Sequence, residues 1–113
     1  MKEKNLTDLV HFSEDGAHKE TLHESDRIWS EVVCLDRNQV LGPLSDPSSD
    51  AICTVVAGEV AVQVDRGRGR VKQWGSVLVP AGSTLVVKNA STDPAVLLLV
   101  AAPPPAPRKE GSA

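Results

Sequence analysis

The chain has 113 residues, about the size of one domain, and it is too short to enclose a second sizeable core. Its 12 lysine and arginine residues against 15 aspartate and glutamate residues give a formal net charge of −3. A mildly acidic chain lacks the positive field that drives general binding to nucleic acids or anionic membranes, so we expect neither as a partner. With one Phe, two Trp and no Tyr, it also offers no aromatic platform for stacking bases.

The ends and the cysteines indicate the cellular context. No apolar run of signal-peptide length follows Met1, and the longest apolar run, residues 95–102, is far shorter than the roughly 20 residues that span a bilayer. We therefore expect a cytoplasmic protein. Cys34 and Cys53 both lie in strand-like apolar stretches and form no CxxC pair, which predicts buried free thiols.

The first 26 residues are polar and predict an N-terminal arm. Its one amphipathic piece, residues 6–12, is too short to decide between a helical turn and an edge strand. From residue 27 the pattern becomes β-like, with a strand around Val32 and Val33 and a turn at Asn38 and Gln39. Residues 42–50, which are rich in Pro, Ser and Asp, predict a loop.

The central segment predicts the core. Residues 52–57 form a nearly continuous apolar run, typical of a strand buried on both faces, and residues 60–64 alternate at period two. Residues 65–70 predict a hairpin tip, and short strands follow around residues 71–73, 77–79, 84–88 and 96–100. Frequent turns without a helical period indicate an all-β sandwich or barrel over residues 27–102.

The last segment, residues 103–113, carries four prolines and ends in charged and small residues. It predicts a disordered Pro-rich tail, with a ligand for an SH3-type domain as the alternative.

Residues 75–89 resemble the second sequence motif of the cupin superfamily. That motif runs Gly, a strand, Pro-x-Gly, two residues, His, three residues and Asn, and here Gly75, Pro80, Gly82 and Asn89 match it. Residues 54–60 resemble the end of the first cupin motif, a strand that runs into a Gly-Glu turn. The resemblance covers about residues 20–102 and implies a cupin-type double-stranded β-helix, or jelly-roll barrel, with a pocket inside and often a homodimer.

The resemblance stops at the metal ligands. Leu85 stands where the superfamily has its second-motif His, and counting back from Gly58 places the first-motif His positions near Leu44 and Asp46. The Glu position falls at Ala51 or Asp50. Two loop carboxylates and a leucine do not form a transition-metal site, so we expect no metal and no other cofactor.

The barrel interior therefore predicts a metal-free ligand pocket. The expected pocket residues are Leu85, Val87, Cys53, Val55, Val62, Asp46 and Asp50. The first hypothesis is a module that binds or senses a small apolar organic molecule, without catalysis. The second is a metal-independent isomerase, epimerase or cyclase that uses Asp or His as acid or base. The third is a non-catalytic dimeric interaction domain whose barrel is packed shut.

Other candidates have plainer interpretations. His11, His18 and His23 are expected to be solvated, or one of them approaches a partner's pocket through an exchanged N-terminal arm. The alternating Arg-Gly sequence at residues 66–70 suggests an anion grip or an RGG-like tract, but a solvated hairpin tip is favoured. Trp74 is expected to cover the barrel end or a dimer interface, and Trp29 to be partly exposed or at an interface.

Overall fold

Two antiparallel sheets make up the fold. The computed structural model describes residues 1–106. A five-stranded sheet has the order β1-β2-β9-β4-β7, and a four-stranded sheet has the order β3-β8-β5-β6. After a short 3-10 helix, η1 (Leu6–Leu9), the strands are β1 (His18–Glu24), β2 (Trp29–Leu35), β3 (Val40–Leu44), β4 (Asp50–Ala57), β5 (Glu59–Val64), β6 (Gly67–Lys72), β7 (Ser76–Val79), β8 (Leu85–Lys88) and β9 (Ala95–Ala102).

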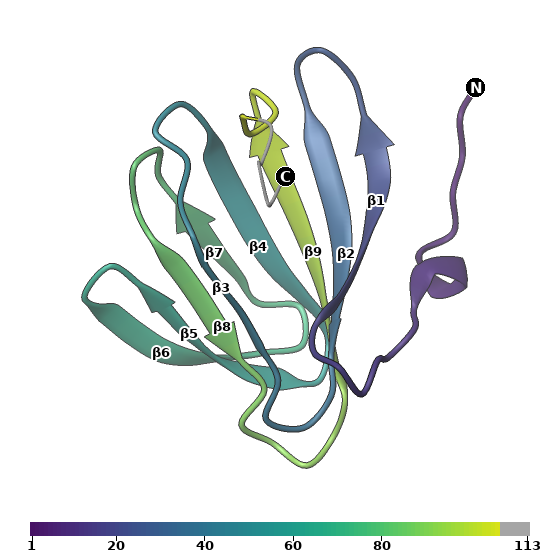
Figure 1. Ribbon diagram of the computed structural model, residues 1–113, viewed down its shortest axis with the longest axis vertical. Coiled ribbons are helices and arrows are strands. Elements are labelled where there is room, and N and C mark those ends of the chain that lie inside the picture. Colours follow the sequence, from purple (N-terminus) through teal and green to yellow (C-terminus); the bar gives the residue numbers. More distant parts are fainter. Residues whose placement is uncertain (107–113) are drawn as a thin grey trace.

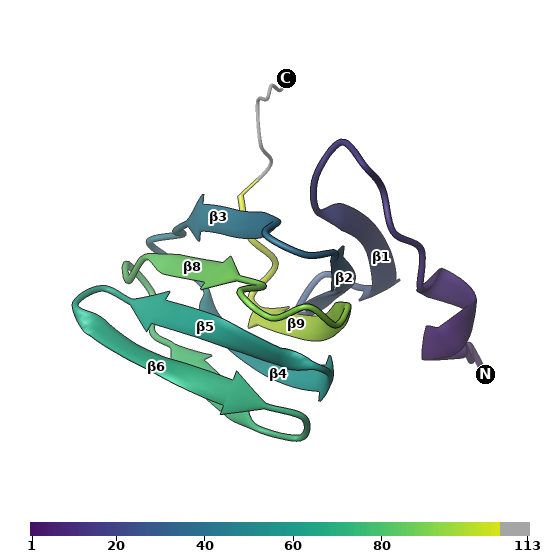
Figure 2. The same ribbon diagram turned by 90° about the horizontal axis from the view of Figure 1, so that it is seen from below.

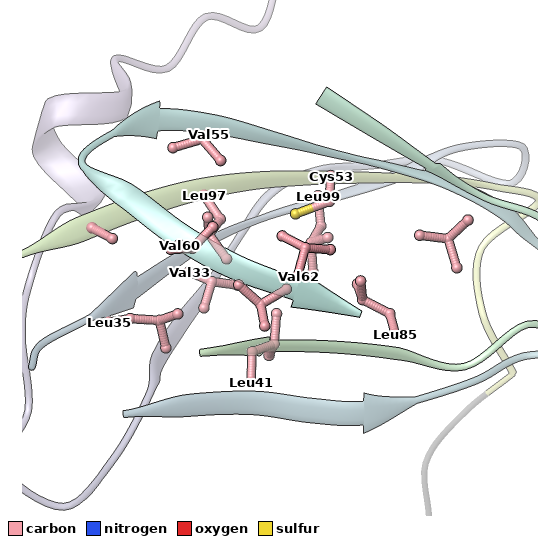
Figure 3. Packing of buried hydrophobic residues seen from close by; sticks show 13 residues of the cluster. Val33, Leu35, Leu41, Cys53, Val55, Val60, Val62, Leu85, Leu97 and Leu99 are labelled. Atoms are coloured by element: carbon pink, nitrogen blue, oxygen red, sulfur yellow. The ribbon is translucent and has the colours of Figure 1, made fainter. Parts of the chain in front are cut away.

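The two sheets lie face to face, as Figure 2 shows, and the core fills the space between them. The core side chains come from both sheets and include Val33 and Leu35 of β2, Val60 and Val62 of β5 and Leu97 of β9. Figure 3 shows them pointing toward one another from the two layers. The prediction of an all-β fold is confirmed, and it follows from the period-two pattern that sends alternate residues inward.

β9 is continuously apolar because it is covered on both faces. It lies in the middle of the five-stranded sheet, between β2 and β4. Leu97 and Leu99 face the core between the sheets. Val96 and Leu98 face the other way, into a second cluster that also contains Leu9 of the N-terminal arm.

The amphipathic piece at residues 6–12 contains the helical turn, and the edge strand of the N-terminal arm is a separate segment that the sequence did not predict. Residues 6–9 form the helical turn η1, and β1 is an edge strand paired with β2. Figure 1 shows η1 beside β1, at the edge of the five-stranded sheet. Among residues 1–106, no helix has both the length and the apolar character needed to cross a membrane.

Parts of the two segments predicted as a loop and a hairpin tip are in fact strands, whereas residues 45–49 are the loop that the sequence predicts. Residues 42–44 belong to β3, and Gly42, at φ 101°, lies at an irregularity in the pairing of this strand with β8. Pro43 is tolerated there because β3 is an edge strand. Residues 67–70 belong to β6, because a two-residue turn at Asp65 and Arg66 suffices to close the hairpin.

Candidate functional site

A cavity of about 310 Å³ lies at one end of the barrel. The loop that joins β3 to β4 and the end of β9 meet at this end of the molecule (Figure 1). Most of the lining side chains are apolar, and serines and one aspartate stand among them. The lining residues are Trp29, Leu44, Ser45, Asp46, Pro47, Ser49, Ala51, Val79, Pro80, Ser83, Leu85, Leu99, Ala101, Pro105 and Ala106.

One wall of the cavity is a row of cross-strand neighbours on the five-stranded sheet. Trp29 of β2 pairs with Ala101 of β9, Ala101 pairs with Ala51 of β4, and Ala51 pairs with Val79 of β7. All four residues line the cavity. Two alanines at the centre of the row leave space that larger side chains would fill, so small residues on adjacent strands open the barrel here.

The opposite wall comes from the four-stranded sheet. Leu44 of β3 and Leu85 of β8 are cross-strand partners, and both line the cavity. Leu85 is 2% exposed and also packs into the core cluster, so it lies where the cavity meets the closed part of the barrel. This position agrees with the inward direction that the motif spacing predicts for Leu85.

Asp46 stands at the cavity rim with its carboxylate engaged by backbone donors. Oδ1 accepts from the amides of Ser48 at 2.8 Å and Ser49 at 3.0 Å, and Oδ2 accepts from the amide of Ala106 at 2.8 Å. These hydrogen bonds, that from Ala106 most of all, hold the pKa of Asp46 below its ordinary value. The carboxylate is therefore ionised at neutral pH, and it connects the loop to the C-terminal segment.

The C-terminal residues 103–106 form a strap across this end of the barrel. Ser49 Oγ donates to the carbonyl of Pro103 at 2.6 Å, and the amide of Ala106 donates to Asp46. Pro105 and Ala106 contribute to the cavity lining. Residues 103–106 are thus attached to the barrel, in contrast to the expected free tail, and the rest of that tail, residues 107–113, lies outside the described residues.

The other expected pocket residues lie elsewhere. Asp50 is exposed, and its Oδ1 accepts from the amide of Ala81 at 2.9 Å, outside the cavity lining. Val87, Cys53, Val55 and Val62 are buried in the core cluster rather than in the cavity wall, and Figure 3 labels the last three among the packed side chains.

Both thiols are free and buried, as the sequence predicts. Burial raises the pKa of Cys53 to about 12, because a thiolate in apolar surroundings loses its hydration. Burial also raises the pKa of Cys34, against a smaller lowering by a backbone hydrogen bond involving His11. Neither cysteine is activated as a nucleophile.

The histidines lie away from the cavity. His18 Nε2 is 2.8 Å from Glu20 Oε2, and His11 Nε2 is 4.0 Å from the same oxygen. None of the three histidines lines the cavity. Within residues 1–106, no group of three or more His, Cys, Asp or Glu residues is arranged to hold a metal ion.

The two tryptophans differ in their surroundings. Trp29 is half-buried and lines the cavity, which its sequence parity with Glu31 does not reveal. Trp29 lines the cavity because it pairs with Ala101, and this cross-strand register cannot be predicted from the sequence of one strand. Trp74 is 73% exposed at φ 75°, so its indole does not cover the barrel end.

Comparisons with known proteins give matches among solved structures. No protein-family model and no curated protein matches the sequence. The structure of TT1209 from Thermus thermophilus is similar, with TM-score 0.88 and 28% identity over 93% of this chain and 100% of that chain. An RmlC-like cupin from Desulfovibrio desulfuricans has TM-score 0.82 and 24% identity, covering 92% of this chain and 98% of its own.

A third similar structure is a Klebsiella pneumoniae protein with a double-stranded β-helix domain. Its TM-score is 0.85 at 17% identity, over 91% of this chain and 90% of that chain. The high TM-scores show that these structures share the fold of two facing antiparallel sheets described above. This chain therefore has the double-stranded β-helix fold that is seen in these cupin structures.

Proposed function

We propose that this protein binds a small apolar organic molecule in the cavity at the end of its barrel. The observation that carries the proposal is a cavity of about 310 Å³ whose walls are mainly aliphatic and aromatic. Ligand sites span about 300–1,000 Å³ and combine apolar walls with a few polar groups, so this cavity suits a compact ligand. The hydroxyl of Ser45 offers a hydrogen bond at the rim.

The polar groups near the cavity support binding over acid–base catalysis. A general acid at neutral pH needs a carboxyl whose pKa is raised, whereas the pKa of Asp46 is lowered by the hydrogen bonds it accepts. Both oxygens of Asp46 are occupied by backbone amides. An isomerase, epimerase or cyclase that depends on Asp46 is therefore disfavoured by this geometry.

A fluorescent apolar probe tests the proposal. N-phenyl-1-naphthylamine is uncharged and brightens in apolar surroundings. In the Trp74→Phe background, Trp29 is the remaining tryptophan and reports proximity by energy transfer. We expect saturable binding with transfer from Trp29, and native mass spectrometry of the untreated protein checks for a co-purified molecule that is released on unfolding.

Two neighbouring substitutions locate the probe. Ala101→Phe places a ring in the cavity, and Ala102→Phe places the same ring on the exposed side of β9. We expect the first to abolish probe binding and the second to leave it unchanged. If Ala101→Phe does not fold, Ala51→Leu narrows the same wall. Probe binding that survives both cavity substitutions contradicts the proposal.

An exposed apolar strip supports a second copy of this chain as a partner. Ile52 of β4 and Leu78 of β7 are cross-strand neighbours on the outer face of the five-stranded sheet, 46% and 62% exposed. Exposed neighbouring apolar side chains are typical of interfaces, and a two-fold axis would let the strip cover itself.

Light scattering after size exclusion measures the mass in solution. We expect a dimer of the 12.0 kDa chain. Leu78→Lys should give a monomer, while Val40→Lys, at an exposed apolar position on the other sheet, should remain dimeric. A monomeric wild-type protein contradicts the proposed homodimer.

A further inference from the structure

The outer face of the four-stranded sheet collects positive charge. On β5, Val60 and Val62 are buried, so Ala61 between them faces outward. The cross-strand partners of Ala61 are Arg70 on β6 and Lys88 on β8. Cross-strand partners project from the same side of a sheet, so both cations stand on the outer face.

Arg68 of β6 adds a third cation to this basic face. It is the cross-strand partner of Gln63, which lies two residues along β5 from Ala61. Neighbouring strands are about 4.8 Å apart, so Arg70 and Lys88 flank Ala61 from either side at a backbone separation of about 10 Å. Long side chains at this spacing can reach one group held above the methyl of Ala61.

The cations border a depression in the surface. Its volume is about 440 Å³, and its lining residues are Ala61, Val62, Gln63, Arg68, Gly69, Arg70, Val86 and Lys88. The floor is low because Ala61, which faces outward between the flanking cations, has a short side chain. Among the described residues, those that line the depression include no carboxylate and no aromatic ring.

Little of this charge is neutralised by the protein itself. Among residues 1–106, the ion pair on this face joins Arg70 Nη1 to Glu59 Oε2 at 3.5 Å. Both side chains are partly solvated, so the pair is weak. Because the whole chain has a net charge of −3, three cations around one depression reflect their placement in the sheet rather than the composition.

We propose that this depression binds the phosphate group of a small phosphorylated molecule. Guanidinium groups hold phosphate oxygens through two parallel hydrogen bonds, and a lysine ammonium adds a mobile point charge. Arg68, Arg70 and Lys88 supply both kinds of donor around a floor with room for a dianion. The lack of aromatic side chains in the lining disfavours nucleic acid, because bases would find nothing on which to stack.

The probe for this site is inorganic pyrophosphate, followed through the amide signals of the ¹⁵N-labelled protein at constant ionic strength. We expect saturable shifts centred on Ala61, Gly69 and Lys88. The double substitution Arg68→Gln with Lys88→Gln should weaken binding about tenfold or more, because each charge-assisted hydrogen bond stabilises the complex substantially. Lys19→Gln, an exposed lysine on the other sheet, removes one charge and should change little.

Glu59→Gln provides a test with the opposite sign. It removes the carboxylate that competes for Arg70, so pyrophosphate should bind more tightly. Charged residues on an edge strand such as β6 also guard against aggregation. If the double substitution promotes aggregation while pyrophosphate binding stays unchanged, the cations serve to prevent aggregation and the proposal is wrong. The proposal is also wrong if Lys19→Gln weakens pyrophosphate binding as much as the double substitution does. Tighter binding of a single-stranded oligonucleotide than of pyrophosphate also overturns it.

Discussion

Replacing Asn89 by Ala should destabilise the fold far more than truncating a polar side chain at the surface. Asn89 follows β8 at the end of the motif segment and is completely buried. Its Nδ2 donates to the carbonyls of Leu35 at 2.9 Å and Asp93 at 2.8 Å. Its Oδ1 accepts from the amide of Ser91 at 3.0 Å and from the Ser91 hydroxyl at 3.1 Å. One amide thus joins the end of β2 to the loop before β9.

The size of the effect follows from which groups lose a partner. A buried carbonyl left without its donor costs about 1–3 kcal/mol, and this applies in full to Leu35, which is buried. Water can replace the partner at the solvent-facing Asp93 and Ser91, so their losses are smaller. We expect Asn89→Ala to lower the free energy of unfolding by about 2–4 kcal/mol, a large part of the roughly 5–15 kcal/mol of a typical domain.

Urea unfolding followed by tryptophan fluorescence and by circular dichroism measures this loss. The matched control is Asn5→Ala, which removes two hydrogen bonds to Thr7 at an exposed helical turn and should cost about 0.5–1 kcal/mol. If the slope of the free energy of unfolding against urea concentration is unchanged, the variants and the wild type expose the same surface on unfolding and can be compared. A loss at Asn89 no larger than that at Asn5 would refute the reasoning.

Three further outcomes are expected. Ala106→Pro removes the amide donor to Asp46 and should weaken N-phenyl-1-naphthylamine binding several-fold. Unchanged binding would show that the attachment of residues 103–106 does not contribute to the ligand site. The pKa of Asp46 lies below its ordinary 3.8, so its stabilising effect is full above that pH and is lost as the pH falls below it. Acid titration should therefore destabilise the wild type more than Asp46→Asn, and equal acid sensitivity would contradict this assignment. Cys53, with its pKa at about 12 instead of 9.0, should react with iodoacetamide at pH 8 about 1,000-fold more slowly than a free thiol, and rapid labelling of the folded protein would be inconsistent with its burial.

The motif at residues 75–89 is informative because turns depend on local chemistry. Pro80 and Gly82 define a tight turn, and the turn sets the direction of Leu85. Asn89 can be placed at the motif's end, but its hydrogen bonds reach Leu35, 54 residues earlier in the chain. A partner at that separation is set by strand topology, which a single sequence does not state.

The cavity wall is harder to predict for the same reason. Trp29, Ala51 and Ala101 come from three segments, and only the register of β2, β9 and β4 brings them together. Alternation within each strand can place Ala51 and Ala101 on an inward face, but not beside each other. The strap at residues 103–106 was not predicted, because a run of prolines is typical of a detached tail. In this fold the carbonyl of Pro103 and the amide of Ala106 attach it to the loop before β4.

The central place of β9 constrains the order in which this protein can fold. β2 and β4 lie on either side of β9 and have no direct pairing with each other in the five-stranded sheet. During synthesis both strands emerge well before residue 95, so each must wait, with an open edge, for its shared partner to arrive. Distant pairings of this kind fold slowly. The nascent chain is thus exposed to mispairing at the open edges of β2 and β4 until β9 leaves the ribosome.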